Sequence, residues 1–446
     1  MNVLALIANL EVGGAQTLLP HFAKVSPRAG IRLSVAYLGG PDSTAVATRL
    51  RAADICPVNL DIPRRMGVSA LRRVGRHIAS VEPDILHTHL GPADALGCTA
   101  ARLLDVPAVS TIHAMDWNGP DTRERARLAL MARARKHGAA RIIAVSESAR
   151  HTYLAQGWDV SDRLVTVYNG IDASPKPGSG IAVRRELGFE SDDFVIGMVS
   201  PLRPEKGHDL AIEAIRLLRS RMPRVRLLIA GEGAAAVAVG RLAQPLGEAV
   251  VLTGARSDTM ALLDSLDILL QPSRADALPT TIIEAMAASV PVVASAVGGI
   301  PEIIEDNHTA VLVPAPPSAY AIADAISALL DDPTRRRQLA AAARRRYEER
   351  FTAGPWVSRT RAVYEAVLLE RGSASTSRRR RDVPRVLRSA TRAVATSFFA
   401  LGDEAQSMAT THPVDNDVSC RFDDDRPAGR DHADSAPRSA SASRVG

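Results

Sequence analysis

Two cations stand in a short loop between an apolar run and a helical pattern, where they could hold a phosphate group. Arg203 and Lys206 flank Pro204 and Glu205, soon after the apolar run at residues 194–199. Cations beside a helix N-terminus attract anions strongly, because the free backbone N–H groups there add to the same attraction. The loop therefore suits a pyrophosphate group. Two solvated surface charges are the alternative.

Two acids lie in a second block, which runs from residue 272 to residue 286. Asp276 precedes Pro279, and because proline suits the first turn of a helix, we expect a helix to begin there. Glu284 then falls inside this helix among apolar neighbours. A buried carboxylate needs hydrogen-bond partners. The ribose hydroxyls of a nucleotide would serve, and so would backbone amides.

Two glycines follow the first apolar run. Gly13 and Gly14 precede a helical pattern, so the backbone there could approach a phosphate closely and meet it with free helical N–H groups. Their spacing is not that of the dinucleotide-binding fingerprint. A plain tight turn is the alternative.

Three histidines lie where apolar runs end. His87 and His89 share one face of an expected strand, because strand side chains alternate with a period of two. No carboxylate or cysteine stands out in the sequence as a partner for them, so a hydrogen-bonded structural pair is favoured over a metal site. His113 closes the next run, where a strand should open into a cleft.

The elements that must position these residues follow from the alternation of short apolar runs with helix-length segments. Such alternation indicates parallel sheets with helices on both faces. A stretch rich in Pro, Gly and Ser at residues 172–180 divides the pattern into two similar halves. We therefore expect the α/β class, with two Rossmann-like domains facing a central cleft into which the loops after the strands project. The expected strands lie at residues 3–8, 31–38, 85–90, 109–114, 141–145 and 164–168, and at 194–199, 225–230, 250–253, 268–271, 291–294 and 310–313.

Composition excludes several classes of protein. Of 446 residues, 46% are hydrophobic but only 4% aromatic, which suits cores of Val, Ile, Leu and Ala. The three cysteines, Cys56, Cys98 and Cys420, lie far apart and form no CxxC pair, so neither a disulfide framework nor a zinc site is expected. The N-terminus lacks a basic signal-peptide region. The longest uncharged run, residues 285–300, is too short to span a bilayer. A cytoplasmic protein is expected.

Two basic segments could contact an anionic membrane surface. Residues 122–141 interleave arginines with Leu and Met. After residue 371, Ser, Ala, Arg, Asp and Pro dominate, so residues 371–446 are expected to be largely disordered. Within that tail, residues 384–401 would place apolar and basic side chains on opposite sides of a helix, which is typical of an interfacial helix. A solvated helix and disorder, respectively, are the alternatives.

An ordered set of motifs over residues 1–370 resembles the family 4 (group 1) glycosyltransferases, which have the GT-B fold. Each motif is weak alone, but their order and spacing are specific. The acids of the family's E-x7-E signature correspond to Asp276 and Glu284. The motifs are Gly13-Gly14-Ala15-Gln16, Thr111-Ile112-His113, Val167-Tyr168-Asn169-Gly170-Ile171-Asp172, Pro204-Glu205-Lys206-Gly207, Gly231-Glu232-Gly233, the block from Asp276 to Glu284, and Gly298-Gly299-Ile300-Pro301-Glu302.

The resemblance implies a division of labour. Residues 1–172 would form an acceptor domain, residues 173–352 a nucleotide-sugar donor domain, and residues 353–370 a helix that crosses back to the first domain. Glu284 would hold the donor ribose. The implied catalytic residues are His113, Arg203, Lys206 and Asp276. The implied donor-binding residues are Gly13, Gly14, Arg203, Lys206, Asp276, Ala277, Leu278, Pro279, Thr280 and Glu284.

Three positions depart from the family pattern. Asp276 is one methylene shorter than the usual Glu. Ser200-Pro201-Leu202 stands where members often have Gly-Arg-Leu, so the basic role would pass to Arg203. Ser289 replaces a glycine at the end of the helix that contains Glu284.

The activity implied by the resemblance is transfer of a sugar from a UDP- or GDP-sugar to a saccharide or lipid-linked acceptor, with retention of anomeric configuration. Cell-surface polysaccharide, glycolipid or glycoconjugate synthesis would be the setting. No cofactor, metal ion or nucleic-acid partner is expected. The rival hypotheses are a catalytically silent nucleotide-sugar-binding protein and a GT-B epimerase or phosphorylase.

Overall fold

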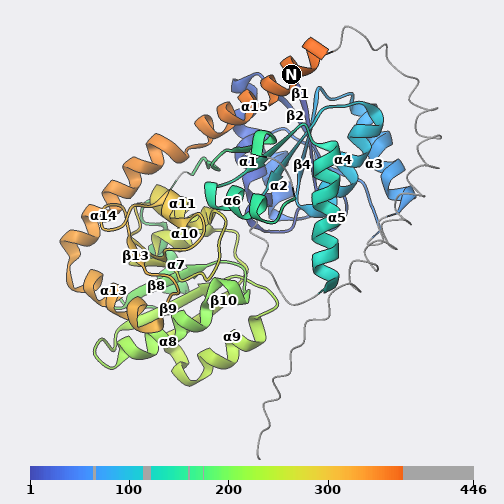
Figure 1. Cartoon of the computed structure of the whole chain (residues 1–446). Helices are drawn as coiled ribbons and strands as arrows, with labels where there is room; N and C mark the ends of the chain where they lie inside the picture. The colour runs from blue at the N-terminus through green and yellow to red at the C-terminus, as the bar shows by residue number, and fades with distance from the viewer. Residues whose placement is uncertain (64–66, 114–121, 159–160, 174, 375–446) are drawn as a thin grey trace, which may run out of the picture. The chain divides into compact units, whose positions relative to one another are not determined.

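The computed structural model of the protein describes residues 1–63, 67–113, 122–158, 161–173 and 175–374 (Figure 1). The described residues form two parallel sheets, each with its own helices. The expected interfacial helix at residues 384–401 lies outside the described residues, as does the expected disorder after residue 374.

The described part of the first domain is built on a seven-stranded sheet in the order β3-β2-β1-β4-β5-β6-β7, with every neighbouring pair parallel. Six of these strands match expected apolar runs. The exception, β3, has two residues, too few to show a periodic pattern. The strands are β1 (Asn2–Ile7), β2 (Arg32–Tyr37), β3 (Val58–Asn59), β4 (Ile85–His89), β5 (Ala108–Ile112), β6 (Arg141–Ala144) and β7 (Leu164–Thr166).

Helices connect these strands, and side chains cap two of them. Thr44 accepts a hydrogen bond from the N–H of Ala47 at the start of α2, and Ser146 does the same for α6 through the N–H of Ala149. The helices are α1 (Gly14–Val25), η1 (Ser26–Ala29), α2 (Ala45–Arg51), α3 (Val68–Val81), α4 (Gly91–Leu104), α5 (Thr122–Gly138), α6 (Glu147–Ala155) and η2 (Ser161–Arg163).

The second domain repeats the plan with a six-stranded sheet in the order β10-β9-β8-β11-β12-β13. All six strands match expected runs, and adjacent strands are parallel. They are β8 (Phe194–Val199), β9 (Val225–Ala230), β10 (Val250–Gly254), β11 (Ile268–Gln271), β12 (Val292–Ser295) and β13 (Val311–Val313). The helices are α7 (Ser179–Glu186), η3 (Pro204–Lys206), α8 (His208–Arg219), α9 (Ala236–Ala243), η4 (Gln244–Ala249), α10 (Thr259–Asp264), α11 (Thr280–Ala287), α12 (Ile300–Ile303), α13 (Ala319–Asp331), α14 (Pro333–Arg346) and η5 (Tyr347–Phe351).

Both sheets reverse their strand order in the middle, and these reversals position the candidate residues. In the first sheet the order runs outward from β1 and from β4; in the second it runs outward from β8 and from β11. In open α/β sheets, the loops after the two strands at such a reversal diverge and leave room for a ligand. The loop after β8 carries Arg203 and Lys206, and the loop after β11 carries Asp276.

The segment that leaves the first domain lies beside the segment that returns to it. Ile171 pairs with Thr352, and the N–H of Ala353 donates to the carbonyl of Ile171. Gly170 permits this approach, because a Cβ there would lie 2.3 Å from the carbonyl oxygen of Thr352. Helix α15 (Ala353–Ala374) starts here and packs on α1, with the rings of Trp356 and Phe22 5.3 Å apart.

The ends of two elements differ from the expected boundaries. Helix α7 begins at Ser179, inside the stretch expected to be a linker, because Gly180 packs against the backbone of Asp264 and its N–H donates to that carboxylate. Helix α15 continues to Ala374, beyond the end expected at residue 370.

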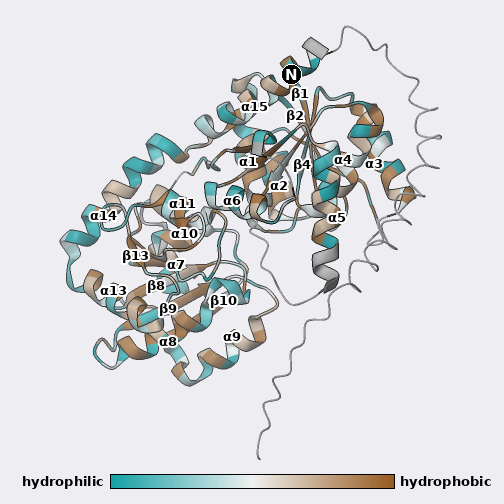
Figure 2. Cartoon of the chain, in the orientation of Figure 1, coloured by the Kyte–Doolittle hydropathy of each residue, from teal (hydrophilic) through white to brown (hydrophobic). Residues whose placement is uncertain are grey.

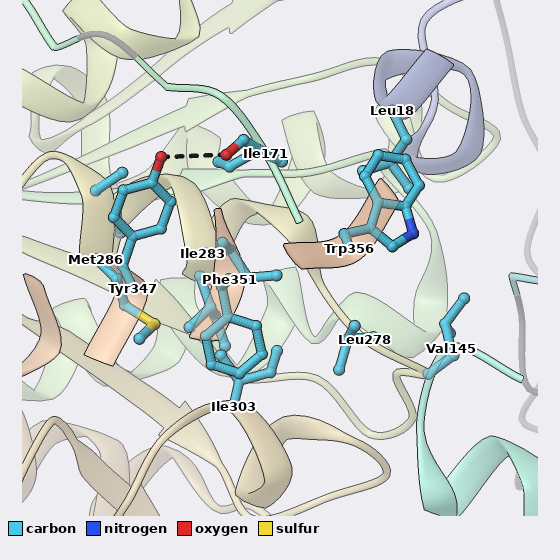
Figure 3. Close-up of a cluster of buried hydrophobic side chains, with 14 of the residues drawn as sticks. Leu18, Val145, Ile171, Leu278, Ile283, Met286, Ile303, Tyr347, Phe351 and Trp356 are labelled. Carbon is cyan, nitrogen blue, oxygen red and sulfur yellow. Dashed lines mark hydrogen bonds between the residues drawn. The ribbon is translucent and has the colours of Figure 1, made fainter. Parts of the chain in front are cut away.

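Apolar side chains from both sequence halves share one buried cluster around this junction. Leu18, Ile283 and Phe351 belong to it, and Figure 3 shows the Tyr347 hydroxyl donating to the carbonyl oxygen of Ile171 at 3.1 Å. Figure 2 shows that α14 is coloured largely hydrophilic. Among the described residues, no helix is long and apolar enough to cross a membrane.

Candidate functional site

The centre of the site is an ion pair between the two loops that diverge from β8 and β11. Nζ of Lys206 lies 2.7 Å from Oδ2 of Asp276, and their side chains are only 16% and 8% exposed. The sequence suggested both residues separately but not their contact. A nearly buried cation held by a carboxylate is fixed in place, and its two remaining N–H donors stay available to a ligand.

Polar side chains of β11 and its loop hold Asp276. Nε2 of Gln271 and Oγ of Ser273 donate to Oδ2 of Asp276 at 3.2 and 3.1 Å. Gln271 and Ser273 are themselves buried. Sequence reasoning did not select either residue, although both lie within five positions before Asp276. This carboxylate therefore accepts from three donors, which explains how the shorter acid can be held firmly at this position.

The two loops are also joined away from Lys206. Arg274 forms an ion pair with Asp209 at 2.6 Å, and its N–H donates to the carbonyl of Glu205 at 2.7 Å. Gly207 lies in the left-handed region, with φ of 73°, where a Cβ would lie 2.1 Å from the carbonyl oxygen of Pro272. The cationic loop and the acidic loop thus form one packed unit.

Arg203 stands apart from this unit. Its side chain is 63% exposed, and its guanidinium lies 3.9 Å from Glu205. Only Lys206, of the two cations singled out from the sequence, is held against the carboxylate.

Glu284 lies on α11, the helix that begins just after Asp276, with Pro279 in the N-cap position. Its side chain is partly buried, and among the described residues it has no hydrogen-bond partner. Burial raises the pKa of this carboxyl from 4.5 to about 7, although Arg49 of α2 acts in the opposite direction. A carboxylate left unpaired in such a position is suited to accept hydrogen bonds from a ligand.

The remaining candidate residues of this loop could contribute through their backbone groups. Ala277, Leu278 and Pro279 are buried, and Figure 3 shows Leu278 in the apolar cluster. Thr280 opens α11, and among the described residues the backbone N–H groups of Thr280 and Thr281 have no partner and could meet an anion. Ala277, Leu278 and Thr280 can therefore offer backbone N–H groups rather than side chains, whereas Pro279 has no N–H to offer.

The motif around Gly299 ties the acidic loop to helix α6 of the first domain. A Cβ on Gly299 would lie 2.0 Å from the carbonyl oxygen of Ala277, so only glycine fits. The carboxylate of Glu302 accepts hydrogen bonds from the N–H groups of Glu147 and Ser148, at 2.7 and 2.8 Å. A negative charge at a helix N-terminus is stabilising.

The glycines of the first domain open helix α1. Gly13 is its N-cap, with an extended backbone, and Gly14 is its first residue. A Cβ on Gly14 would meet no atom of the described residues within 4 Å. The described part of the protein therefore does not require glycine there and leaves space for a ligand.

The three histidines form a connected group at the ends of β4 and β5. Nδ1 of His89 lies 2.9 Å from Nε2 of His113, and the ring centroids of His87 and His89 are 4.1 Å apart, with the ring planes tilted by 39°. Both of the first two histidines are hydrogen-bonded, but His87 is bonded to Tyr364 and Thr111 and His89 to His113, and no hydrogen bond joins the pair among the described residues. Burial lowers the pKa of all three, that of His87 to about 3, so the rings are neutral at pH 7.

Helix α5 presents fewer surface charges than its sequence suggested. Arg135 is buried and donates two hydrogen bonds to Asp94, the shorter at 2.8 Å. Asp94 also accepts from Thr88 and Ser110. Met131 is buried too. The basic face available for a membrane surface is reduced accordingly.

Comparison with known families identifies the class of protein. Residues 12–174 match the model of Glycosyltransferase Family 4, and residues 181–346 match that of Glycosyl transferases group 1. The chain belongs to the family 4 (group 1) glycosyltransferases and has their GT-B fold.

Individual relatives agree with this class. The chain is 29% identical over 271 residues to D-inositol 3-phosphate glycosyltransferases of Mycobacterium tuberculosis and Mycobacterium bovis, covering 55% of this chain and 54% of theirs. The chain thus spans about half the length of these curated relatives.

Solved structures share the fold. HepE of Anabaena with UDP and glucose has a TM-score of 0.71 at 24% identity, covering 82% of this chain and 99% of that chain. Sucrose-phosphate synthase of Thermosynechococcus elongatus has a TM-score of 0.66 at 20% identity, covering 84% and 98%.

Proposed function

We propose that the protein transfers a sugar from a nucleotide diphosphate donor to an acceptor, with retention of anomeric configuration. The observation that carries this proposal is the Lys206–Asp276 ion pair, held at the strand-order reversal of the second sheet. Glu284, the carboxylate without a partner among the described residues, lies further along the same segment, inside α11. A cation for the diphosphate and an acceptor for ribose hydroxyls are what such a donor requires.

The chemical difficulty is the negative charge that builds up on the departing diphosphate. Lys206 and the free N–H groups at the start of α11 would stabilise this charge as it develops. Their positions are set before the reaction, so little reorganisation is needed. Arg203, which is exposed, would have to move to contribute.

Retention would follow from attack on the face from which the diphosphate leaves. Asp276 is engaged by Lys206, Gln271 and Ser273, which makes it a poor nucleophile. The leaving phosphate would instead guide the acceptor hydroxyl and take its proton. Because Lys206 can supply the neutralising charge, we expect transfer to persist in EDTA; loss of activity restored by magnesium or manganese would overturn this mechanism.

The donor is proposed to be a UDP- or GDP-sugar. One structural neighbour is complexed with UDP-glucose. The acceptor is proposed to be a saccharide or a lipid-linked group, in the synthesis of a polysaccharide, glycolipid or glycoconjugate. For a lipid-linked acceptor, contact with the inner face of a membrane would keep enzyme and acceptor together.

The test is a screen of UDP-, GDP- and ADP-sugars for thermal stabilisation, followed by transfer assays with the donor that binds. A ligand present at 100 times its dissociation constant should add about 2.7 kcal/mol of stability. Proton NMR of the product then reports its anomeric configuration. Absence of stabilisation by every nucleotide sugar would refute the proposal. Binding without donor hydrolysis or transfer would favour a silent nucleotide-sugar-binding protein.

A further inference from the structure

We propose that His89 is a positioning residue for His113, which it engages at Nε2 so that Nδ1 is the ring nitrogen left for the substrate. This inference rests on the proposed transferase function, in which His113 meets the donor sugar. The register of the sheet places His89 beside His113. His89 on β4 pairs with Thr111 on β5, and Thr111 is two residues before His113.

The geometry leaves His113 little choice of orientation. Its Nε2 lies 2.9 Å from Nδ1 of His89, a normal hydrogen-bond distance, and the two ring centroids are 5.2 Å apart. Both imidazoles are neutral because burial disfavours their charged forms. One of the two nitrogens in this contact therefore carries the proton and donates it to the other. Among the described residues, Nδ1 of His113 has no hydrogen-bond partner, so it alone remains for a substrate hydroxyl.

The ring of His89 is supported by the ring of His87. The ring of His87 contacts it at a centroid distance of 4.1 Å, and both nitrogens of His87 are engaged, Nδ1 by the Tyr364 hydroxyl at 2.6 Å and Nε2 by the Thr111 hydroxyl at 2.7 Å. Tyr364 is fully buried on α15. A ring whose two nitrogens are both bonded cannot turn freely, and it therefore supports the ring that contacts it. The support for His113 extends in this way to helix α15.

The role of His89 differs from that of a catalytic residue. Its contact is with His113, so removing it should loosen the His113 ring while leaving the donor loops of the second domain unchanged. Misplacing a reacting group by a small distance can lower a rate by about a hundredfold. A loss of kcat with an unchanged donor dissociation constant is therefore the expected signature.

The side chains of Asn and Gln distinguish this role from simple packing. An Asn amide reaches the position of Nδ1 of a histidine, whereas a Gln amide reaches the position of Nε2. His89→Asn should retain most of kcat, while His89→Gln and His89→Leu should lower it about ten- to a hundredfold. The dissociation constant of UDP-glucose, or of the donor found in the screen, should stay within about twofold for all three variants. His151→Leu, at a side chain 72% exposed on α6, is the control and should leave both quantities unchanged.

Two further measurements make the proposal decisive. In a His113→Ala background, His89→Leu should have no additional effect on kcat, because a positioning residue acts only through its target. Imidazole 15N NMR of histidine-labelled protein should show shifted His113 signals in His89→Leu and near-native signals in His89→Asn. Signals are assigned by their loss in His113→Ala.

Normal turnover of His89→Leu would overturn the proposal, as would equal loss of kcat in all three variants or unchanged His113 signals in His89→Leu. The NMR comparison needs no substrate. If the wild-type protein turned over no nucleotide sugar, the proposed function would fail, while the NMR result would still decide whether His89 positions His113.

Discussion

Glu284 allows the donor site to be tested through the stability of the unliganded protein. Its pKa rises from 4.5 to about 7 on folding because partial burial disfavours the ionised form and no described residue donates a hydrogen bond to it, and this corresponds to roughly 3 kcal/mol at most. Because the folded state binds this proton more tightly than the unfolded state, the ionised group destabilises the fold. The penalty is absent below pH 4.5, grows between pH 4.5 and about 7, and is constant above that pH.

Glu284→Gln removes the charge and keeps the shape. Since the side chain is partly exposed, we expect a gain of about 1–3 kcal/mol at pH 8 and none at pH 4.5. Urea unfolding measured across this pH range is the assay. Glu248→Gln, at an exposed position on η4, is the matched control and should show no such pH-dependent gain.

The same substitution should weaken the binding of a nucleotide sugar more than tenfold, since a hydrogen bond to a charged group contributes roughly 1.5–3 kcal/mol. In the wild-type protein the affinity for UDP-glucose should fall as the pH drops below about 7, where Glu284 becomes protonated, and this dependence should vanish in Glu284→Gln. A variant that is no more stable at pH 8, or that gains equally at both pH values, would refute the reasoning. A more stable variant with unchanged donor affinity would refute the ribose assignment alone.

Three other substitutions probe the site and its support. Lys206→Ala should lower kcat much more than donor affinity, because its cation matters most as the diphosphate leaves; comparable losses in steady-state kinetics and calorimetry would argue against this role. Asp276→Glu, which restores the residue usual in the family, should fold with a melting temperature near that of the wild type, and failure to fold would mean that the loop tolerates only the shorter acid. Asp94→Ala should cost about 3–5 kcal/mol in urea unfolding, because it leaves the buried Arg135 without its carboxylate. A cost below about 1 kcal/mol would show that Arg135 reaches solvent.

Local sequence patterns were enough to predict the architecture, because buried parallel strands need continuous apolar runs and their connections need helix-length segments. In the part of the chain that the structure describes, twelve expected runs are strands, and only the two-residue β3 had no signal. The sequence also identified the positions where chemistry could occur, since loops after strands carry the ligand sites of such sheets. Glu284 stood out as an acid among apolar neighbours before its surroundings were known.

Which of these residues meet depends on how the strands are ordered in the folded sheets. Lys206 and Asp276 lie far apart in the chain, and they touch because β8 and β11 are adjacent at the reversal of strand order, which local periodicity does not specify. The same holds for His89 and His113, brought together by the pairing of β4 and β5. Arg203 and Arg135 show the converse. The sequence placed Arg203 in the site and Arg135 on the surface, but Arg203 is exposed and Arg135 is buried against Asp94. The type of a residue sets its charge, but the fold of the surrounding chain decides which groups that charge contacts.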